Sequence, residues 1–338
     1  MPENMELTRE RLLELQALPL ERKVGFTAAR IAEWYNHYNG KVHVSFSGGK
    51  DSTVLLYLVR KLFPDVRGMF VDTGLEYPEI RDFVKTWTNV DWVRPAKTFL
   101  QIIREYGYPV VSKEVAHYVH YSKKGDCWCA AAMGLVEEFE SPRTHRLMKI
   151  KRGGRYDCSR WKFLCDAPFP IGDQCCDEMK KKTAKKYSRE HDTHSMLATM
   201  TIESRLREKS WLQHGCNAFD AKEPKSTPMA FWTEQDVLRY IKTMNIPIAS
   251  VYGKIVEGKD GKLCTTGCSR TGCMFCCFGV HREKYPNRFQ QMYKTHPKQW
   301  DYCINKLGLK QVLDYIHVPY LPVENDQMEF DFENNFPK

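Results

Sequence analysis

A β-rich segment at residues 41–46 runs directly into a glycine-containing loop, and an apolar helical segment at residues 53–62 follows at once. The loop reads Ser47-Gly48-Gly49-Lys50-Asp51-Ser52-Thr53. Glycines let backbone N–H groups approach an anion, and the N-terminus of the following helix adds a partial positive charge. The segment therefore predicts an α/β chain with a phosphate-binding turn, although a turn that merely needs glycine would look similar.

The side chains of this loop suggest roles around a nucleoside triphosphate. Lys50 could neutralise a β- or γ-phosphate, and the hydroxyls of Ser47, Ser52 and Thr53 could donate hydrogen bonds. Asp51 would orient Mg²⁺ or cap the helix. The loop lacks the GxxxxGK[ST] spacing of the ordinary P-loop. We predict that it binds ATP or a related adenine nucleotide, with Lys50 and Asp51 as the catalytic side chains.

Strands and helices alternate along the N-terminal half of the chain. Two helices are expected between residues 6 and 38. Predicted strands at residues 66–71 and 91–94 alternate with predicted helices at 78–87 and 98–106. This spacing predicts a parallel, doubly wound, Rossmann-like sheet.

Residues 115–170 interrupt this alternation with cysteines, a Gly-Gly pair and much basic charge, so they are expected to be an insertion. A helix at residues 175–189, a strand at 195–200 and a helix capped by Thr233 then restore the pattern. We predict three parts: N-terminal helices at residues 1–40, a nucleotide-binding domain at 41–250, and cysteine-rich loops with a polar tail at 251–338.

Several motifs in this sequence resemble one known family. Residues 47–52 are similar to the SGGxDS loop of the adenine nucleotide alpha-hydrolase superfamily, the ATP pyrophosphatases. FVDTGLEYPEIRDFV (residues 70–84) and TPMAFWTEQDVLRYIKTMNIPI (residues 227–248) resemble its phosphoadenosine phosphosulfate (PAPS) reductase branch, and ESRLREKS (residues 203–210) resembles the arginine-bearing segment more loosely. The resemblance implies adenosine beside Asp72-Thr73-Gly74, and contacts to phosphate or sulfate from Arg205 and Arg207.

Members of this family catalyse different reactions, and two features of the sequence bear on which reaction this chain catalyses. The loop is complete, as in members that cleave ATP between the α- and β-phosphates. Reductases of this type carry a nucleophilic cysteine near the C-terminus, whereas the last cysteine here is Cys303, in a stretch with helical periodicity. We expect an ATP-dependent adenylating sulfurtransferase. The alternatives are a sulfonucleotide reductase and a non-catalytic nucleotide-sensing or nucleic-acid-binding protein.

Thirteen cysteines in a chain of this length favour metal or sulfur chemistry over a disulfide framework. Iron–sulfur members of the family hold a [4Fe–4S] cluster with an adjacent cysteine pair and a later CxxC. The matching residues are Cys175, Cys176, Cys273 and Cys276. Zinc is the rival metal for four thiolates. Three neighbours could replace one ligand: Cys264, Cys268 and Cys277. Four further cysteines are expected to hold no metal: Cys127, Cys129, Cys158 and Cys165.

The formal net charge of +9, from 51 Lys and Arg against 42 Asp and Glu, favours a polyanionic partner such as tRNA or DNA. The basic excess gathers around residues 149–155 and 180–189, although such runs are also common on solvated helix faces. A cysteine desulfurase is an expected sulfur donor, and a homodimer is left open. Because the sequence shows neither a secretory segment nor an apolar stretch of about 20 residues, a cytoplasmic protein without a membrane span is expected.

Overall fold

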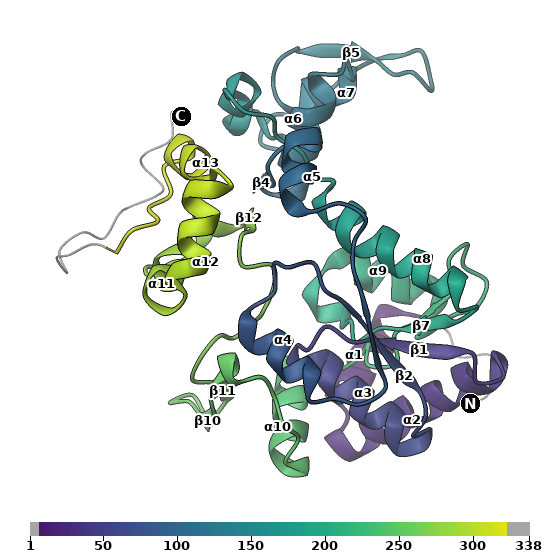
Figure 1. Ribbon diagram of the computed structural model, residues 1–338. Coiled ribbons are helices and arrows are strands. Elements are labelled where there is room, and N and C mark those ends of the chain that lie inside the picture. Colours follow the sequence, from purple (N-terminus) through teal and green to yellow (C-terminus); the bar gives the residue numbers. More distant parts are fainter. Residues whose placement is uncertain (1–6, 323–338) are drawn as a thin grey trace. The chain divides into compact units, whose positions relative to one another are not determined.

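A computed structural model describes residues 7–322 of the 338 (Figure 1). The chain divides into two compact units. The first unit comprises Met1–Pro95 and Lys180–Cys273, and the second comprises Ala96–Met179 and Met274–Lys338. The boundaries predicted at residues 40 and 250 stay a prediction, since this division follows other breaks in the chain.

A six-stranded sheet forms the centre of the first unit, in the order β3-β2-β1-β7-β9-β8. All neighbouring pairs are parallel except β8 with β9. The strands are β1 (Val42–Ser45), β2 (Arg67–Val71), β3 (Val90–Val93), β7 (His194–Met196), β8 (Asn217–Ala218) and β9 (Lys225–Ser226). The predicted α/β, mostly parallel, doubly wound sheet is confirmed. The order reverses at β1, and ligands of such sheets bind beyond the carboxyl ends of the strands at this switch point.

Seven α-helices of the described residues belong to the same unit as this sheet. They are α1 (Arg9–Ala17), α2 (Leu20–His37), α3 (Lys50–Leu62), α4 (Pro78–Lys85), α8 (Lys182–Glu190), α9 (Arg205–His214) and α10 (Glu234–Met244). Helix α3 is the most deeply placed, since Val54, Leu55 and Leu56 are fully buried and it packs against both α2 and α10. Helix α10 begins at Glu234 after the predicted cap, and Thr233 forms a capping box with Asp236.

Short elements complete the first unit. They are the 3-10 helices Thr201–Glu203 and Ser250–Tyr252, the hairpin of β10 (Ile255–Glu257) with β11 (Leu263–Thr265), and the last residues of a π-helical turn at Asp177–Lys181, which leads into α8. The helix expected at residues 175–189 is therefore present with a π turn near its start, while β7 is shorter than the strand expected at residues 195–200.

The second unit is mainly helical. Its first part contains α5 (Phe99–Tyr106), β4 (Val110–Val111), α6 (Lys113–Ser122), α7 (Cys127–Ala132), the hairpin of β5 (Glu138–Glu140) with β6 (Leu147–Lys149), and the 3-10 helix Ser159–Asp166. Its second part contains β12 (Cys277–Phe278), the 3-10 helix Val280–Arg282, α11 (Arg288–Thr295), α12 (Pro297–Asp301), the π-helix Tyr302–Lys306 and α13 (Leu309–Tyr315). Strand β12 pairs with β4 in parallel, which joins the two parts.

Helices cover much of the region that we expected to be loops and a polar tail. Residues 288–315 are almost entirely helical, because buried apolar side chains recur there at helical spacing, including Phe289, Met292, Val312 and Leu313. The part of the tail at residues 323–338 lies outside the described residues. Between residues 7 and 322, no helix is both long enough and apolar enough to cross a bilayer.

A buried ion pair joins α2 to α10. Lys23 Nζ lies 2.6 Å from Asp236 Oδ2, and the two side chains are only 2% and 12% exposed. The same carboxylate oxygen accepts hydrogen bonds from the backbone N–H and the hydroxyl of Thr233, so it also caps α10. A single carboxylate therefore fixes both the start of α10 and its position against α2.

Replacing Lys23 with Ala should destabilise the protein strongly, because Asp236 would be left buried without its counter-charge. We expect a loss of ~3–5 kcal/mol in the free energy of unfolding, measured by urea denaturation. The control is Glu14→Ala, which removes the exposed pair of Glu14 with Arg11 and should cost less than ~1 kcal/mol. Similar losses in the two variants would contradict a structural role for the buried pair.

Candidate functional site

The loop after β1 turns sharply into α3. Gly48 has a φ of +72°, and a Cβ atom there would lie 2.7 Å from Val84 Cγ2 and 2.9 Å from Ile80 Cγ2, both on α4. Gly49 is the N-cap of α3 and provides no side-chain cap, so the first N–H groups of the helix lack that partner. Only glycine fits this approach at position 48, and the turn places the N-terminus of α3, whose helix dipole favours an anion, directly after β1.

The hydroxyl groups of the loop are hydrogen-bonded within it. Ser52 Oγ and Thr53 Oγ1 donate to the carbonyl of Gly49 at 2.9 and 3.0 Å. Ser47 Oγ lies 3.0 Å from Ser52 Oγ and accepts a hydrogen bond from the N–H of Gly49 at 3.4 Å. Contacts from these hydroxyls to phosphate stay a prediction. In the structure they stiffen the turn.

Lys50 is almost completely buried, with 4% of the residue exposed. Its Nζ donates to the carbonyl of Ser269 at 3.0 Å and lies 3.1 Å from Glu234 Oε1. Its backbone N–H donates to the hydroxyl of Tyr252 at 3.3 Å. The charge is thus held by Glu234 at the start of α10, and a phosphate that used it would have to compete with this carboxylate.

Asp51 occupies the first turn of α3 with a partly buried side chain, and its Oδ1 lies 3.9 Å from Lys50 Nζ. Burial raises its pKa, while the nearby charges of Lys50 and Arg270 act in the opposite direction. Its Oδ1 is buried and has no hydrogen-bond partner within the described part of the chain. A carboxylate oxygen held in this way is a suitable ligand for a hard divalent cation.

The loop after β2 lies at the next strand end. Asp72 is buried, and its Oδ2 accepts a hydrogen bond from Arg81 at 3.0 Å and lies 3.6 Å from Arg94 Nε. Thr73 bonds to the carboxylate of Glu76 through both its backbone N–H and its hydroxyl. Gly74 has a φ of +75° and open space around it. The predicted adenosine segment is therefore a tight, internally bonded turn.

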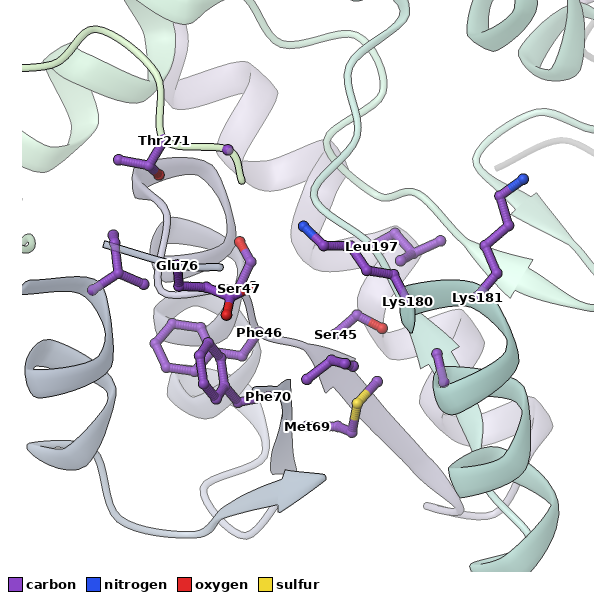
Figure 2. A pocket seen from close by; sticks show the side chains of 14 residues that line it. Ser45, Phe46, Ser47, Met69, Phe70, Glu76, Lys180, Lys181, Leu197 and Thr271 are labelled. Carbon is purple, nitrogen blue, oxygen red and sulfur yellow. The ribbon is translucent and has the colours of Figure 1, made fainter. Parts of the chain in front are cut away.

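A cavity of about 260 Å³ opens at the carboxyl ends of β1, β2 and β7 (Figure 2). Its apolar wall includes Phe46, Met69, Phe70, Ile80 and Leu197. The polar lining residues are Ser45, Ser47, Glu76, Lys180, Lys181 and Thr271. The cavity lies at the switch point of the sheet and combines an apolar wall with hydroxyl, ammonium and carboxylate groups, which suits a nucleobase with its sugar and phosphate.

Arg205 and Arg207 were predicted to contact phosphate, and their surroundings in the structure differ from each other. Arg207 forms an ion pair with Glu203 and is held near Asp51, and burial together with Arg270 lowers its pKa. Arg270 donates to the other oxygen of Glu203 at 2.5 Å. Arg205 is exposed on α9. Of the two, Arg207 is brought to the loop at residues 47–53.

Several residues of this site could not be found by the motif search. Glu234, Tyr252, Ser269 and Arg270 surround Lys50 and Asp51, and Thr271 contacts both the hydroxyl of Tyr252, at 2.6 Å, and the cavity. The available signal was the run Ser269-Arg270-Thr271-Gly272 inside the cysteine-rich segment. This run contains an arginine, two hydroxyl side chains and a glycine, all typical of a phosphate site. Because cysteines flank it, we assigned the segment to a metal site instead.

The four proposed cluster ligands are distributed over both units. Cys175, Cys176 and Cys276 belong to the second unit, and Cys273 is the last residue of the first. In the second unit, Tyr108 forms a bridge with Ile171, and β4 two residues later pairs with β12, which begins at Cys277. Residues 108–111 therefore pair both with Ile171, four residues before Cys175, and with the strand that directly follows Cys276.

No group of three or more His, Cys, Asp or Glu side chains is close enough to hold a metal ion among residues 7–322. Of the cysteines weighed as substitutes, Cys264 is exposed on β11, Cys268 is half-buried, and Cys277 is buried, with its pKa raised by burial. Burial also raises the pKa of Cys129 to about 12 and that of Cys158 to about 11. Such thiols are poor ligands and poor nucleophiles unless a metal displaces the proton.

Replacing Gly48 with Ala should both destabilise the protein and weaken nucleotide binding. The new methyl group would clash with Ile80 and Val84 in addition to straining the backbone, which alone costs ~1–2 kcal/mol. The matched control is Gly74→Ala, where φ is also positive but no atom lies within 4 Å of the added Cβ. Urea denaturation should show the larger loss for Gly48→Ala, and equal losses would contradict the packing role of Gly48.

Comparisons with known proteins identify the family. The domain described as phosphoadenosine phosphosulfate reductase matches residues 41–112 and 140–278. An uncharacterised protein of Methanocaldococcus jannaschii is 23% identical over 293 residues, which are 86% of this chain and 54% of that protein, so the chain spans about half the length of this relative. Sulfate adenylyltransferase subunit 2 of Alkalilimnicola ehrlichii is 24% identical over 268 residues, which are 77% of this chain and 74% of that one.

The corresponding subunit of Shigella dysenteriae is 25% identical, with the same coverage. Among solved structures, a PAPS reductase from Candida auris in complex with phosphate is 12% identical, with a TM-score of 0.37, over 73% of this chain and 92% of that one. The family match spans well over half of the sequence, including both strand-end loops of the site, and on that ground the chain belongs to the phosphoadenosine phosphosulfate reductase family.

Proposed function

We propose that the protein is an ATP-dependent adenylating sulfurtransferase that acts on a nucleic acid or a metabolite. The observation that carries this proposal is the complete loop at residues 47–53, placed at the switch point of the sheet beside a cavity of nucleoside size. Two relatives are named for the transfer of an adenylyl group to sulfate, which is the same kind of bond formation at the α-phosphate.

The chemistry would proceed in two displacements. An oxygen of the acceptor attacks the α-phosphorus of ATP, the bond to the β-phosphate breaks, and pyrophosphate leaves. A sulfide sulfur then attacks the activated carbon, and its bond to oxygen breaks to release AMP. The N–H groups at the start of α3 would bind phosphate, and Lys50 would leave Glu234 to neutralise the leaving pyrophosphate.

Mg²⁺ would further stabilise the leaving group by binding pyrophosphate oxygens. The residues present fit such an ion, because Asp51 offers a buried carboxylate oxygen that lacks a hydrogen-bond partner in the described residues. Arg207 and Arg270 both bind Glu203 close to the loop, and an anionic ligand could replace that carboxylate.

Cys175, Cys176, Cys273 and Cys276 would hold a [4Fe–4S] cluster. Four thiolate ligands close such a cluster, so an iron open to sulfide would require that only three of these cysteines are ligands. Four thiolates are the usual donor set for such a cluster, although they also suit zinc. The pairing of strand residues 108–111 with both cysteine-bearing segments supports this ligand set, since it brings Cys276 and the Cys175-Cys176 pair into the same part of the second unit.

A sulfonucleotide reductase is the alternative, and it would need an accessible thiolate. Cys303 lies in the π-helix Tyr302–Lys306 and is completely buried beside Cys277, and burial raises its pKa. A buried thiol of raised pKa is a poor nucleophile. The position of Cys303 therefore favours the transferase over the reductase.

Anaerobic incubation with labelled ATP, sulfide and tRNA, DNA or a metabolite as acceptor should yield AMP and pyrophosphate, whereas adenylyl transfer to sulfate would yield adenylyl sulfate and pyrophosphate. Lys50→Ala should weaken ATP binding by ~1.5–3 kcal/mol and leave AMP binding nearly unchanged, because the lost charge belongs to the β/γ end. Lys61→Ala, on the exposed end of the same helix, is the matched control. Isothermal titration calorimetry measures both affinities.

Two outcomes would contradict this assignment. Equal losses of ATP and AMP affinity in Lys50→Ala would remove the lysine from the phosphate site and leave it as a structural partner of Glu234. Sulfite release from PAPS with thioredoxin, abolished by Cys303→Ser, would replace the transferase with the reductase.

Anaerobically purified protein should be brown and contain about four irons per chain, as a cubane cluster requires. Cys273→Ser and Cys276→Ser should each lose the colour and most of the iron, because a thiolate ligand would be missing. Cys127→Ser, at a half-exposed residue whose Sγ donates to the carbonyl of Glu140, should retain both. Colourless protein with stoichiometric zinc would establish a zinc site instead.

A further inference from the structure

A strongly basic surface surrounds the hairpin of β5 and β6 in the second unit, beside α7 in Figure 1. Residues 141–162 hold eight Lys and Arg but a single acid, Asp157. We call residues 141–162 the basic hairpin surface. Its cations are Arg143, Arg146, Lys149, Lys151, Arg152, Arg155, Arg160 and Lys162.

Few of these charges are neutralised by carboxylates. Lys149 pairs with Glu138 at 2.5 Å, and Arg152 pairs with Asp157 at 3.3 Å. The neighbouring acid Glu140 faces His145 at 3.2 Å, and Glu137 is exposed at the start of the hairpin. Within residues 7–322 the other cations have no acidic partner: Arg143, Arg146, Lys151, Arg155, Arg160 and Lys162. Six exposed charges without a carboxylate partner in one short segment create a positive potential that attracts polyanions.

The basic hairpin surface is exposed, but packing and hydrogen bonds attach it to helix α7. Phe139 on β5 is buried, and its cross-strand neighbour Met148 lies on the same side of the hairpin. Cys127 at the start of α7 donates to the carbonyl of Glu140, and the N–H of Cys158 bonds to the carbonyl of Ala132 at the end of α7. The hairpin and the segment after it are therefore both attached to α7, which holds the charges on one scaffold.

Large apolar side chains are exposed among the charges. Leu147 is 68% exposed, and Met148 and Tyr156 are each 45% exposed. The guanidinium of Arg155 lies over the ring of Tyr156, 5.3 Å from its centroid, and Trp128 supports that ring from the edge at 5.6 Å. An exposed ring that contacts a cation and a second aromatic side chain is a platform on which an unpaired base can stack.

We propose that the basic hairpin surface binds a nucleic acid strand with unpaired bases. Cations without carboxylate partners would contact phosphates, while Tyr156 and the exposed Leu147 and Met148 would contact bases. Four of the six unneutralised cations are arginines, whose planar guanidinium suits phosphate and base faces better than the ammonium of lysine does. A membrane surface fits less well, because the apolar groups lie on a three-residue strand and a loop instead of along one face of an amphipathic helix.

This inference narrows the acceptor of the proposed function to a nucleic acid, and in that respect it rests on the proposed function. The surface itself is tested by binding alone, without ATP. Binding of the strand by a protein that releases no pyrophosphate would support the surface and contradict the proposed function. Pyrophosphate release by a protein that does not bind the strand would support the proposed function and contradict the nucleic-acid surface.

The test measures fluorescence anisotropy of a labelled single strand of about 20 nucleotides, long enough for several contacts, with the full chain. The triple variant Arg143→Ala/Arg146→Ala/Lys151→Ala should bind more weakly and reduce the slope of log K against log salt by about 2, since each contact to a single strand contributes ~0.7. The control Lys294→Ala/Lys298→Ala/Lys310→Ala removes the same charge from exposed positions on α11, α12 and α13, and it should bind as the unmodified protein does.

The aromatic contact is tested separately. Tyr156→Ser should weaken binding of the strand about tenfold, and Tyr156→Phe should restore it, because stacking needs the ring and not the hydroxyl. A duplex of the same sequence should bind more weakly than the strand. Equal losses in the two triple variants, or preferential binding to vesicles containing phosphatidylserine, would overturn the proposal.

Discussion

The approach of the Gly48 backbone to helix α4 is the constraint on which the candidate site depends. Ile80 and Val84 would collide with any side chain at this position, so the loop after β1 rests directly on the helix that follows β2. The same helix carries Arg81, which binds Asp72 at the end of β2. One packing contact therefore sets the relation between the two strand-end loops that flank the cavity.

Three cationic side chains around the loop at residues 47–53 are each paired with a carboxylate. Lys50 is held by Glu234, while Arg207 and Arg270 share the two oxygens of Glu203. These carboxylates occupy cations that an anionic ligand would otherwise find free. Binding of a polyphosphate would exchange one anion for another, so much of its electrostatic gain would be offset by the loss of the resident ion pairs.

The local features of the fold could be predicted from sequence, because they depend on neighbouring residues. The turn at residues 47–53, the alternation of strands and helices, and the cap at Thr233 all follow from short patterns. The partners of Lys50 could not be predicted in this way, because Tyr252 is 202 positions away and Ser269 is 219 positions away. Of the helices between residues 288 and 315, only the periodicity around Cys303 was recognised, because Pro297, Gly308 and a π turn interrupt the pattern.

The strand order has a consequence for how the chain reaches this structure. β1 is synthesised well before β7, one of its two partners, because His43 and Thr193, which neighbours β7, are separated by 150 positions. Most of the residues between them belong to the other unit. The central strand of the nucleotide site thus emerges from the ribosome long before its second neighbour, with an unpaired edge. Closing so long a loop makes folding slow and leaves this edge open to pairing with another chain in the meantime.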